Sequence, residues 1–211
     1  MSFDRIAPYY RAMEWMLAGK NLQRCRTRWA GELRQPQRIL LVGEGHGRFL
    51  ELCPQRFPQA RVMCVDASAQ MLAIARQRWH LANGCGDSIE FIQATLPEWS
   101  PPAGEFDLIV TNFFLDCFGP GTLERVIERL TKAAAPRADW LIADFSMPPR
   151  GWRRWRAQVV LALAYGFFRR VTRLEARQLT PPDPILLRAG FQLHRRVAME
   201  CGLLQSDWWS R

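Results

Sequence analysis

The chain has 211 residues, 48% of them hydrophobic, and 29 Lys and Arg against 20 Asp and Glu give it a formal net charge of +9. This composition excludes an intrinsically disordered chain, and the length suits one domain, or one domain with a lid. No run reaches the roughly 18 consecutive apolar residues of a membrane span. Residues 1–5 lack the apolar core of a signal peptide, so we expect a cytoplasmic protein.

The positive charge is almost all arginine, and it suits a nucleic acid, an anionic membrane surface or an acidic substrate. An arginine-rich genome explains it equally well. The cysteines are scattered and show no Cys-x-x-Cys spacing, which favours reduced core thiols over a metal site or disulfides.

Two helices are predicted at the start of the chain. Residues 3–17 place aromatic and apolar side chains at helical spacing, and a second helix is expected over about Asn21–Leu33. The aromatic face of the first helix includes Tyr9 and Tyr10. These tyrosines either close over a ligand site or pack the helix onto the rest of the fold.

The central feature is a glycine loop between a strand and a helix. Ile39–Val42 is a short apolar run typical of a strand buried on both faces, and Gly43-Glu-Gly-His-Gly47 follows it at once. Helical signals resume at Arg48 and continue to Phe57. Glycines at every second position let the backbone turn tightly and approach a ligand, as nucleotide-type ligands require at this point of an α/β sheet.

A second predicted strand, Val62–Val65, ends in Asp66, 23 residues after Gly43. An acid at about this distance can accept hydrogen bonds from both ribose hydroxyls, so the loop and the acid together indicate an adenosine ligand. Ser68 is expected to cap a helix that runs to about Ala82 and that Asn83-Gly84 ends.

The glycine loop and the start of the helix after the second strand together resemble the class I S-adenosylmethionine (SAM) methyltransferases. The motifs that carry the resemblance are Gly-x-Gly-x-Gly and Asp66-Ala-Ser-x-x-Met-Leu72. A dinucleotide fingerprint needs a glycine where Arg48 stands, which disfavours a nicotinamide-dependent oxidoreductase. Residues 3–10 and the strand end at Asp144 resemble the ubiquinone/menaquinone C-methyltransferase branch. The resemblance implies SAM as cofactor and a three-layer doubly wound α/β sheet of about seven strands, mostly parallel, with the last antiparallel.

Further strands are predicted over Ile89–Gln93, Phe106–Asn112 and Asp139–Phe145, with a helix over Gly121–Ala135. A short helix over Pro181–Ala189 and a final strand pair, Gln192–Met199 and Gly202–Trp209, match the methyltransferase ending. The expected parts of the single domain are an N-terminal helical lid (1–35), a SAM-binding core (36–147), a helical lid insertion (148–189) and the strand pair (190–211).

The resemblance assigns roles to residues at the carboxyl ends of these strands. Gln93 is a candidate acceptor for the adenine amine, although a core or edge role is equally open to it. Asp116, after the central strand, is the favoured base, with His46 and His194 as other candidates. The residues expected to bind the cofactor are Tyr9, Gly43, Glu44, Gly45, Gly47, Asp66, Ala67, Ser68, Met71, Gln93, Ala94, Thr95, Asn112 and Phe113. Those expected at the acceptor are Tyr10, Phe114, Trp152 and Trp155.

One position departs from the family pattern. The family usually has an acid two residues before the first glycine, where it anchors the methionine end of SAM, and this chain has Leu41. Glu44 is the candidate to supply the missing charge. The departure leaves open weak SAM binding or a protein that keeps the fold without turnover.

The segment from Arg150 to Arg173 holds seven arginines and no acid, with Trp152, Trp155 and Val159 at helical spacing. It suits a lid that contacts an apolar substrate or a membrane surface, plain packing over the sheet edge, or stacking on RNA.

The functional prediction is a SAM-dependent methyltransferase acting on a small apolar acceptor such as a quinol, a phenol or a lipid-like molecule, with no metal. The alternatives are an RNA methyltransferase and a non-catalytic partner protein with the same fold.

Overall fold

The structure is a computed structural model that describes residues 20–82, 86–172, 176 and 178–211. The predicted helix over residues 3–17, with Tyr9 and Tyr10, lies outside the described residues, as does the helix end at Asn83-Gly84.

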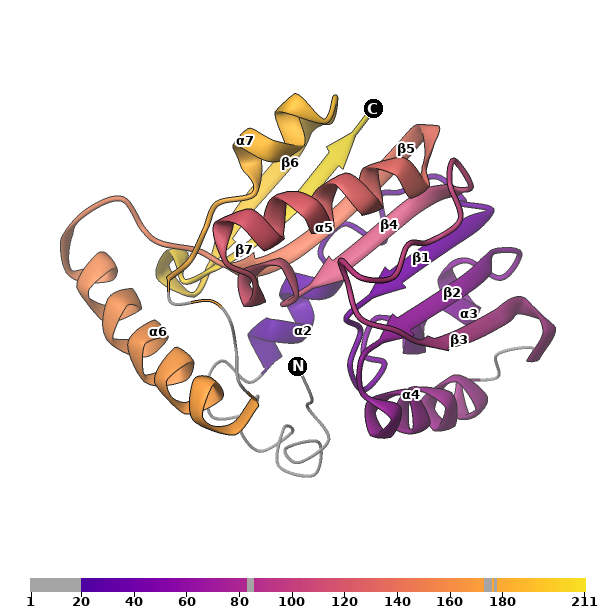
Figure 1. Cartoon of the computed structure of the whole chain (residues 1–211), viewed down its shortest axis with the longest axis horizontal. Coiled ribbons are helices and arrows are strands. Elements are labelled where there is room, and N and C mark those ends of the chain that lie inside the picture. Colours follow the sequence, from indigo (N-terminus) through magenta and orange to yellow (C-terminus); the bar gives the residue numbers. More distant parts are fainter. Residues whose placement is uncertain (1–19, 83–85, 173–175, 177) are drawn as a thin grey trace.

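A seven-stranded sheet in the order β3-β2-β1-β4-β5-β7-β6 runs through the molecule (Figure 1). The first five strands are parallel, and β7 pairs antiparallel with both β5 and β6. The predicted fold class is therefore confirmed, including the inserted final strand. The strands are β1 (Arg38–Val42), β2 (Arg61–Asp66), β3 (Ile89–Gln93), β4 (Phe106–Asn112), β5 (Ala134–Phe145), β6 (Gln192–Met199) and β7 (Leu204–Ser210).

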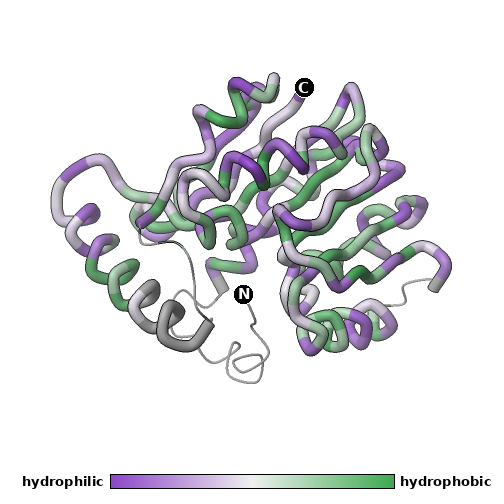
Figure 2. The backbone as a smooth tube through the Cα atoms, in the orientation of Figure 1, coloured by the Kyte–Doolittle hydropathy of each residue, from purple (hydrophilic) through white to green (hydrophobic). Residues whose placement is uncertain are grey.

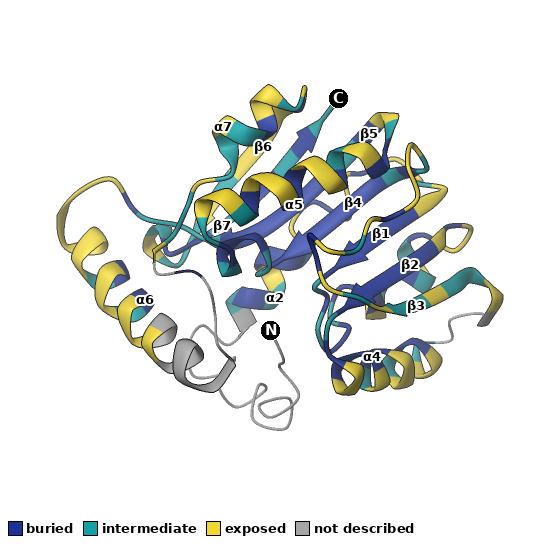
Figure 3. Ribbon diagram, in the orientation of Figure 1, coloured by how far each residue is buried: buried dark blue, intermediate teal, exposed yellow. Residues whose placement is uncertain are grey.

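Both faces of the central strands are buried, which is why β1 and β4 read as continuous apolar runs rather than alternating ones (Figures 2 and 3). Leu40 and Val42 point to the face covered by α5 (Pro120–Ala133) and α7 (Asp183–Arg188). Ile39 and Leu41 point to the opposite face, which packs against α4 (Ala69–Leu81). The carboxyl ends of β1, β2 and β4 therefore meet at one edge between two closed layers.

The remaining helices are short, except for one. They are α2 (Lys20–Thr27), η1 (Leu50–Leu52), α3 (Cys53–Arg56), η2 (Gly86–Ser88), η3 (Leu115–Cys117), the 22-residue α6 (Gly151–Thr172) and η4 (Glu200–Gly202). The predicted cap of α4 is present, because the Ser68 hydroxyl accepts a hydrogen bond from the Met71 amide at 3.2 Å.

Two predicted helices are shorter than expected, and side-chain hydrogen bonds lie at the point where each departs from the prediction. The helix expected over Asn21–Leu33 ends at Thr27, beyond which the buried Trp29 donates its indole N–H to the Ser206 carbonyl at 3.2 Å. The helix expected from Arg48 is only η1 and α3, because the Glu44 carboxylate accepts from the amides of Phe49 and Leu50. Pro54 also removes one N–H from this short segment.

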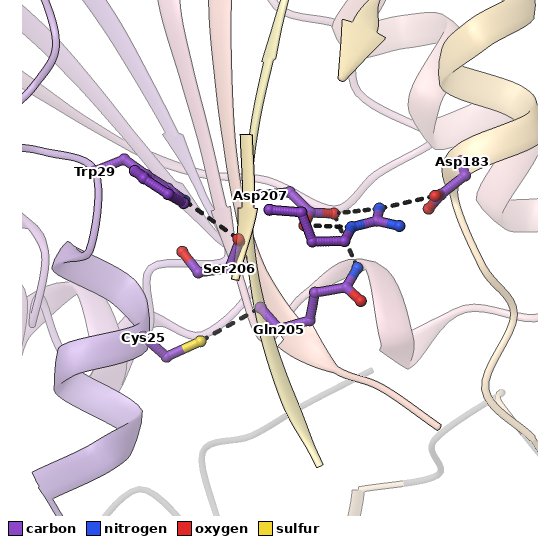
Figure 4. Close-up of polar contacts among 7 residues, drawn as sticks. Cys25, Trp29, Asp183, Gln205, Ser206 and Asp207 are labelled. Atoms are coloured by element: carbon purple, nitrogen blue, oxygen red, sulfur yellow. Dashed lines mark hydrogen bonds and ion pairs between the residues drawn. The ribbon is translucent and has the colours of Figure 1, made fainter. Parts of the chain in front are cut away.

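The last strand is anchored on both sides (Figure 4). On one side, Cys25 of α2 donates its thiol to the Gln205 carbonyl at 3.3 Å. On the other, the Arg196 guanidinium donates two hydrogen bonds, of 2.8 and 2.7 Å, to Asp207 and also pairs with Asp183 at 2.7 Å. These contacts join α2, α7 and the strand pair to the core.

Among the described residues, no helix combines the length and apolarity needed to cross a membrane.

Candidate functional site

Glycine is favoured at the three positions of the loop by different structural features. All three have left-handed backbones, with φ of +65° at Gly43, +61° at Gly45 and +80° at Gly47. A Cβ at position 43 would lie 2.2 Å from Phe114 Cδ2, and one at position 47 would lie 3.0 Å from Ala75 Cα. A Cβ at position 45 would meet nothing within 4 Å. The first and third glycines therefore serve packing, while the second leaves open space.

Asp66 holds the loop and the next helix start together. Its Oδ2 accepts from the Gly45 amide at 2.9 Å, and its Oδ1 accepts from the Ser68 amide at 2.8 Å. Each carboxylate oxygen has a second lone-pair site, so the group can still accept hydrogen bonds from a ligand.

A cavity of about 280 Å³ opens at this edge of the sheet. Nine of the residues predicted for the cofactor or the acceptor line it: Gly43, Gly45, Asp66, Ala67, Met71, Ala94, Thr95, Phe113 and Phe114. Apart from Met71 in the first turn of α4, they come from the carboxyl ends of β1, β2, β3 and β4, as expected for parallel strands.

Three other predicted residues lie away from the cavity wall. Gly47 packs on Ala75, and Ser68 is fully buried at its cap position. Gln93 is exposed and donates its side-chain amide to the Ala67 carbonyl at 3.4 Å.

Glu44 also points away from the cavity. Its buried carboxylate is engaged with the amides at the start of η1. Burial raises the pKa of Glu44 to about 7, against the lowering effect of the Leu50 N–H. Leu41 is buried in the apolar layer beneath the loop, so neither residue offers a charge to the cavity.

Asn112 is buried and is not among the residues that line the cavity. Its side-chain amide lies beside the Glu44 carboxyl, and a hydrogen bond from it lowers the pKa of that group. This predicted cofactor residue is therefore engaged with Glu44 at the base of the loop.

The residue after Asn112 is strained. Phe113 has a φ of +53°, which is costly for a bulky side chain. The Arg26 guanidinium lies 4.9 Å from the centre of its ring, and the Phe145 ring lies 5.4 Å away on another side. These contacts and the Phe113 N–H to Ala143 carbonyl bond hold the ring at the cavity.

Two carboxyl groups lie behind this wall. Asp116 and Asp144 are both buried, and their side chains hydrogen-bond to each other. Burial raises the pKa of both, and at Asp144 the neighbouring Asp116 charge adds to the effect. The Cys117 thiol, on the cavity wall, lies 3.7 Å from Asp116 Oδ1.

Sequence reasoning missed part of the wall. The loop after β3, the end of η3 and the first half of α5 supply Leu96, Pro97, Glu98, Cys117, Phe118, Thr122 and Arg125. Nothing in their spacing signals a site. Trp152 and Trp155 are 63% and 68% exposed and do not line the cavity.

A family model described as "Methyltransferase domain" matches residues 39–137, which span the glycine loop and the first four strands. This region is a class I SAM-dependent methyltransferase domain. Proteins of this fold and family use SAM as their methyl donor.

Curated relatives of the methyltransferase domain include a trans-aconitate 2-methyltransferase from Paracidovorax citrulli, 41% identical over 118 residues, which are 53% of this chain and 42% of the relative. A malonyl-[acyl-carrier protein] O-methyltransferase from a Paenibacillus species is 32% identical over 53% of this chain and 39% of its own length. The matches thus span about half or less of these relatives.

Solved structures support the fold over nearly the whole chain. An O-methyltransferase family protein from Burkholderia thailandensis superposes with a TM-score of 0.71 at 18% identity, covering 98% of this chain and 60% of that protein. The assignment to the ubiquinone/menaquinone branch stays a prediction. Within the described residues, no group of three or more His, Cys, Asp and Glu side chains is placed to hold a metal ion.

Proposed function

We propose that the protein transfers the methyl group of SAM to an oxygen atom of a small acceptor. The observation that carries the proposal is the Asp66 carboxylate, fixed by the Gly45 and Ser68 amides at the wall of the cavity. An acid in this position, beside an open glycine backbone, suits the two hydroxyls of an adenosine ribose.

The wall of the cavity fits the rest of the adenosine group. Ala67, Met71 and Leu96 provide an apolar slot for a flat base, and Phe114 and Phe118 close it with rings 5.0 Å apart. When bound, the cofactor supplies a methyl carbon activated by its sulfonium charge.

We assign proton removal from the acceptor to Asp116, supported by Asp144. A hydroxyl nucleophile loses a proton as it is methylated, and a buried carboxyl with a raised pKa is a suitable base near neutral pH. The wall residue Cys117 connects the pair to the cavity. The chain's other contribution is alignment of the acceptor and exclusion of water by the aromatic wall.

The acceptor we favour is largely apolar, such as a quinol, a phenol or a lipid-like molecule, because Phe113, Phe114 and Phe118 line the cavity. A small carboxylate is the second candidate. Arg125 on the wall favours it, since a guanidinium pairs well with a carboxylate. The name of the trans-aconitate relative points the same way.

The first test is calorimetric titration with S-adenosylhomocysteine, with NAD titrated in parallel. We expect micromolar binding of S-adenosylhomocysteine and none of NAD. Binding of NAD alone would indicate an oxidoreductase, and binding of neither ligand would favour a non-catalytic protein.

A matched pair of glycine variants locates the site. Gly45→Ala and Gly104→Ala introduce the same backbone strain, since their φ values are +61° and +73° and neither Cβ meets an atom within 4 Å. Only Gly45 lines the cavity. We expect Gly45→Ala to weaken S-adenosylhomocysteine binding at least tenfold and Gly104→Ala to leave it unchanged; equal effects would place the ligand elsewhere.

The acceptor is then sought with methyl-labelled SAM and a panel of phenols, quinols and tricarboxylates. Arg125→Ala should abolish transfer to a carboxylate acceptor and spare a phenol. Transfer by the wild-type protein to tricarboxylates and not to phenols or quinols would contradict the apolar assignment.

A further inference from the structure

The outer face of α6 carries an apolar stripe that faces solvent. Trp152, Trp155, Val159 and Leu163 are 63%, 68%, 39% and 71% exposed. Their spacings of three, four and four residues place them on one side of the helix. Four large apolar side chains in one exposed row differ from the single exposed apolar residues that are normal on protein surfaces.

The inner face of α6 already has its partner. Ala157 and Leu161 are buried in a cluster with Ala176 and Leu203, against which Cys117 and Phe145 pack. Figures 1 and 3 show α6 at one end of the molecule, with exposed residues along the part whose burial is described. Packing onto the domain therefore accounts for the inner face and leaves the outer stripe unexplained.

The charged residues of the segment that carries the stripe are all positive. No Asp or Glu occurs between residues 145 and 174, while arginines stand at positions 150, 153, 154 and 156. Arg156 pairs with Glu200 at 3.6 Å, whereas Arg150, Arg153 and Arg154 make no ion pair with a described residue. Arg153 instead lies 5.9 Å from the centre of the Trp152 ring. Figure 2 shows hydrophobic and hydrophilic residues alternating along this helix.

We propose that the outer face of α6 binds an anionic lipid surface, with the helix lying in the plane of the membrane. Tryptophan rings favour the boundary between headgroups and acyl chains, and arginines beside them pair with lipid phosphates. From residue 152 to 163 the stripe is only about 17 Å long, about half of a bilayer's apolar thickness, so it suits lying on a membrane. Because this segment carries arginines and no acids, a positively charged or neutral surface would bind it less well.

Membrane binding through α6 would also determine which acceptors lie close to the cavity. The inner face of α6 packs against Cys117, which is also part of the cavity wall. A membrane-bound α6 therefore holds the cavity close to the lipid, where an apolar acceptor dissolves. This consequence rests on the proposed function, whereas the docking itself does not.

The test is co-sedimentation of the full chain with vesicles of phosphatidylcholine alone and of phosphatidylcholine mixed with phosphatidylglycerol. We expect binding to the mixed vesicles, weakened by added salt, and little to the neutral ones. Trp152→Ser with Trp155→Ser should reduce binding at least tenfold, and Arg153→Glu with Arg154→Glu should abolish it.

The matched control is Leu81→Ser, which removes an exposed apolar side chain on α4 that is 78% accessible. Unchanged vesicle binding by the tryptophan variant, or an equal loss with Leu81→Ser, would overturn the proposal. So would a change from dimer to monomer in the tryptophan variant without any vesicle binding, because a second copy would then cover the stripe. Retained S-adenosylhomocysteine binding by each variant separates this result from failure of the cofactor site.

Discussion

Two pairs of buried carboxyl groups lie at the same edge of the sheet, and they differ in their hydrogen-bond partners. Glu44 and Asp66 accept hydrogen bonds from backbone amides, which fix the shape of the glycine loop. Asp116 and Asp144 hydrogen-bond to each other, so one of them has to carry a proton. The first pair fixes the geometry of the loop, while the second is the pair to which we assign proton removal in the proposed reaction. Predictions for the individual acids can separate these two roles.

The largest effect should come from Asp116→Asn, which removes the proposed base and keeps its volume. We expect turnover to fall roughly a thousandfold, within the range for loss of a general base. Steady-state kinetics with the identified acceptor measures it, and S-adenosylhomocysteine affinity should stay within about twofold. The exposed Asp87→Asn is the control; a similar loss of turnover there, or full activity of Asp116→Asn, would contradict the base assignment.

Glu44→Gln should change how stability depends on pH. The carboxyl has a pKa of about 7 when folded and an ordinary value of 4.5 when unfolded, so the folded state binds more protons between these values. The stability that this proton contributes is present below pH 4.5 and is lost as the pH rises to 7.

The glutamine oxygen can still accept the two amide hydrogen bonds without this penalty. Relative to the variant, the wild-type protein should lose about 3 kcal/mol between those pH values. Urea unfolding at several pH values tests this; parallel pH profiles would refute the raised pKa.

Asp66→Ala should weaken S-adenosylhomocysteine binding about a hundredfold, as expected for two hydrogen bonds to a charged acceptor. Loss of the loop contacts also destabilises the fold, so a control is needed. Asp107 holds two backbone amides in the same way, those of Gln37 and Arg38 at 2.8 and 2.9 Å, outside the cavity. Asp107→Ala should cost comparable stability and leave calorimetric affinity unchanged.

The smallest effect is expected from Asp144→Asn. The raised pKa of Asp144 means that its proton stabilises the folded state at low pH and that this contribution is lost as the pH rises above the ordinary aspartate range. An amide avoids the buried charge, so the variant should be more stable at pH 7 by about 1 kcal/mol. Thermal unfolding at pH 5 and pH 8 checks the sign, because the gain should grow at the higher pH.

The sheet could be predicted from the sequence because each buried parallel strand is a short apolar run with a polar end. The predicted bounds of β3 and β4 agree with the structure, and Ser68 caps α4 as its residue type and position indicate. These features depend on neighbours within a few residues.

Most of the errors come from long-range contacts, such as the bond from Trp29 to β7 at the end of α2. The helix start near Arg48 is an exception, because the Glu44 carboxylate that alters it lies only five and six residues from the amides it accepts from. Arg125 and Cys117 reach the cavity only because α5 and η3 pack above β4. The outward direction of Trp152 and Trp155 depends on which face of α6 the domain covers, and helical spacing leaves that choice open.

The sheet order also constrains how the chain is assembled during synthesis. β6 reaches the rest of the sheet only through β7, which follows it in the chain. When β6 leaves the ribosome it therefore has no edge to join. Its backbone therefore stays unpaired until β7 emerges. The two strands can then form a hairpin, and β7 can pair with β5. The sheet is thus complete only after β7 has emerged, and until then the edge of β5 is open to pairing with other nascent chains.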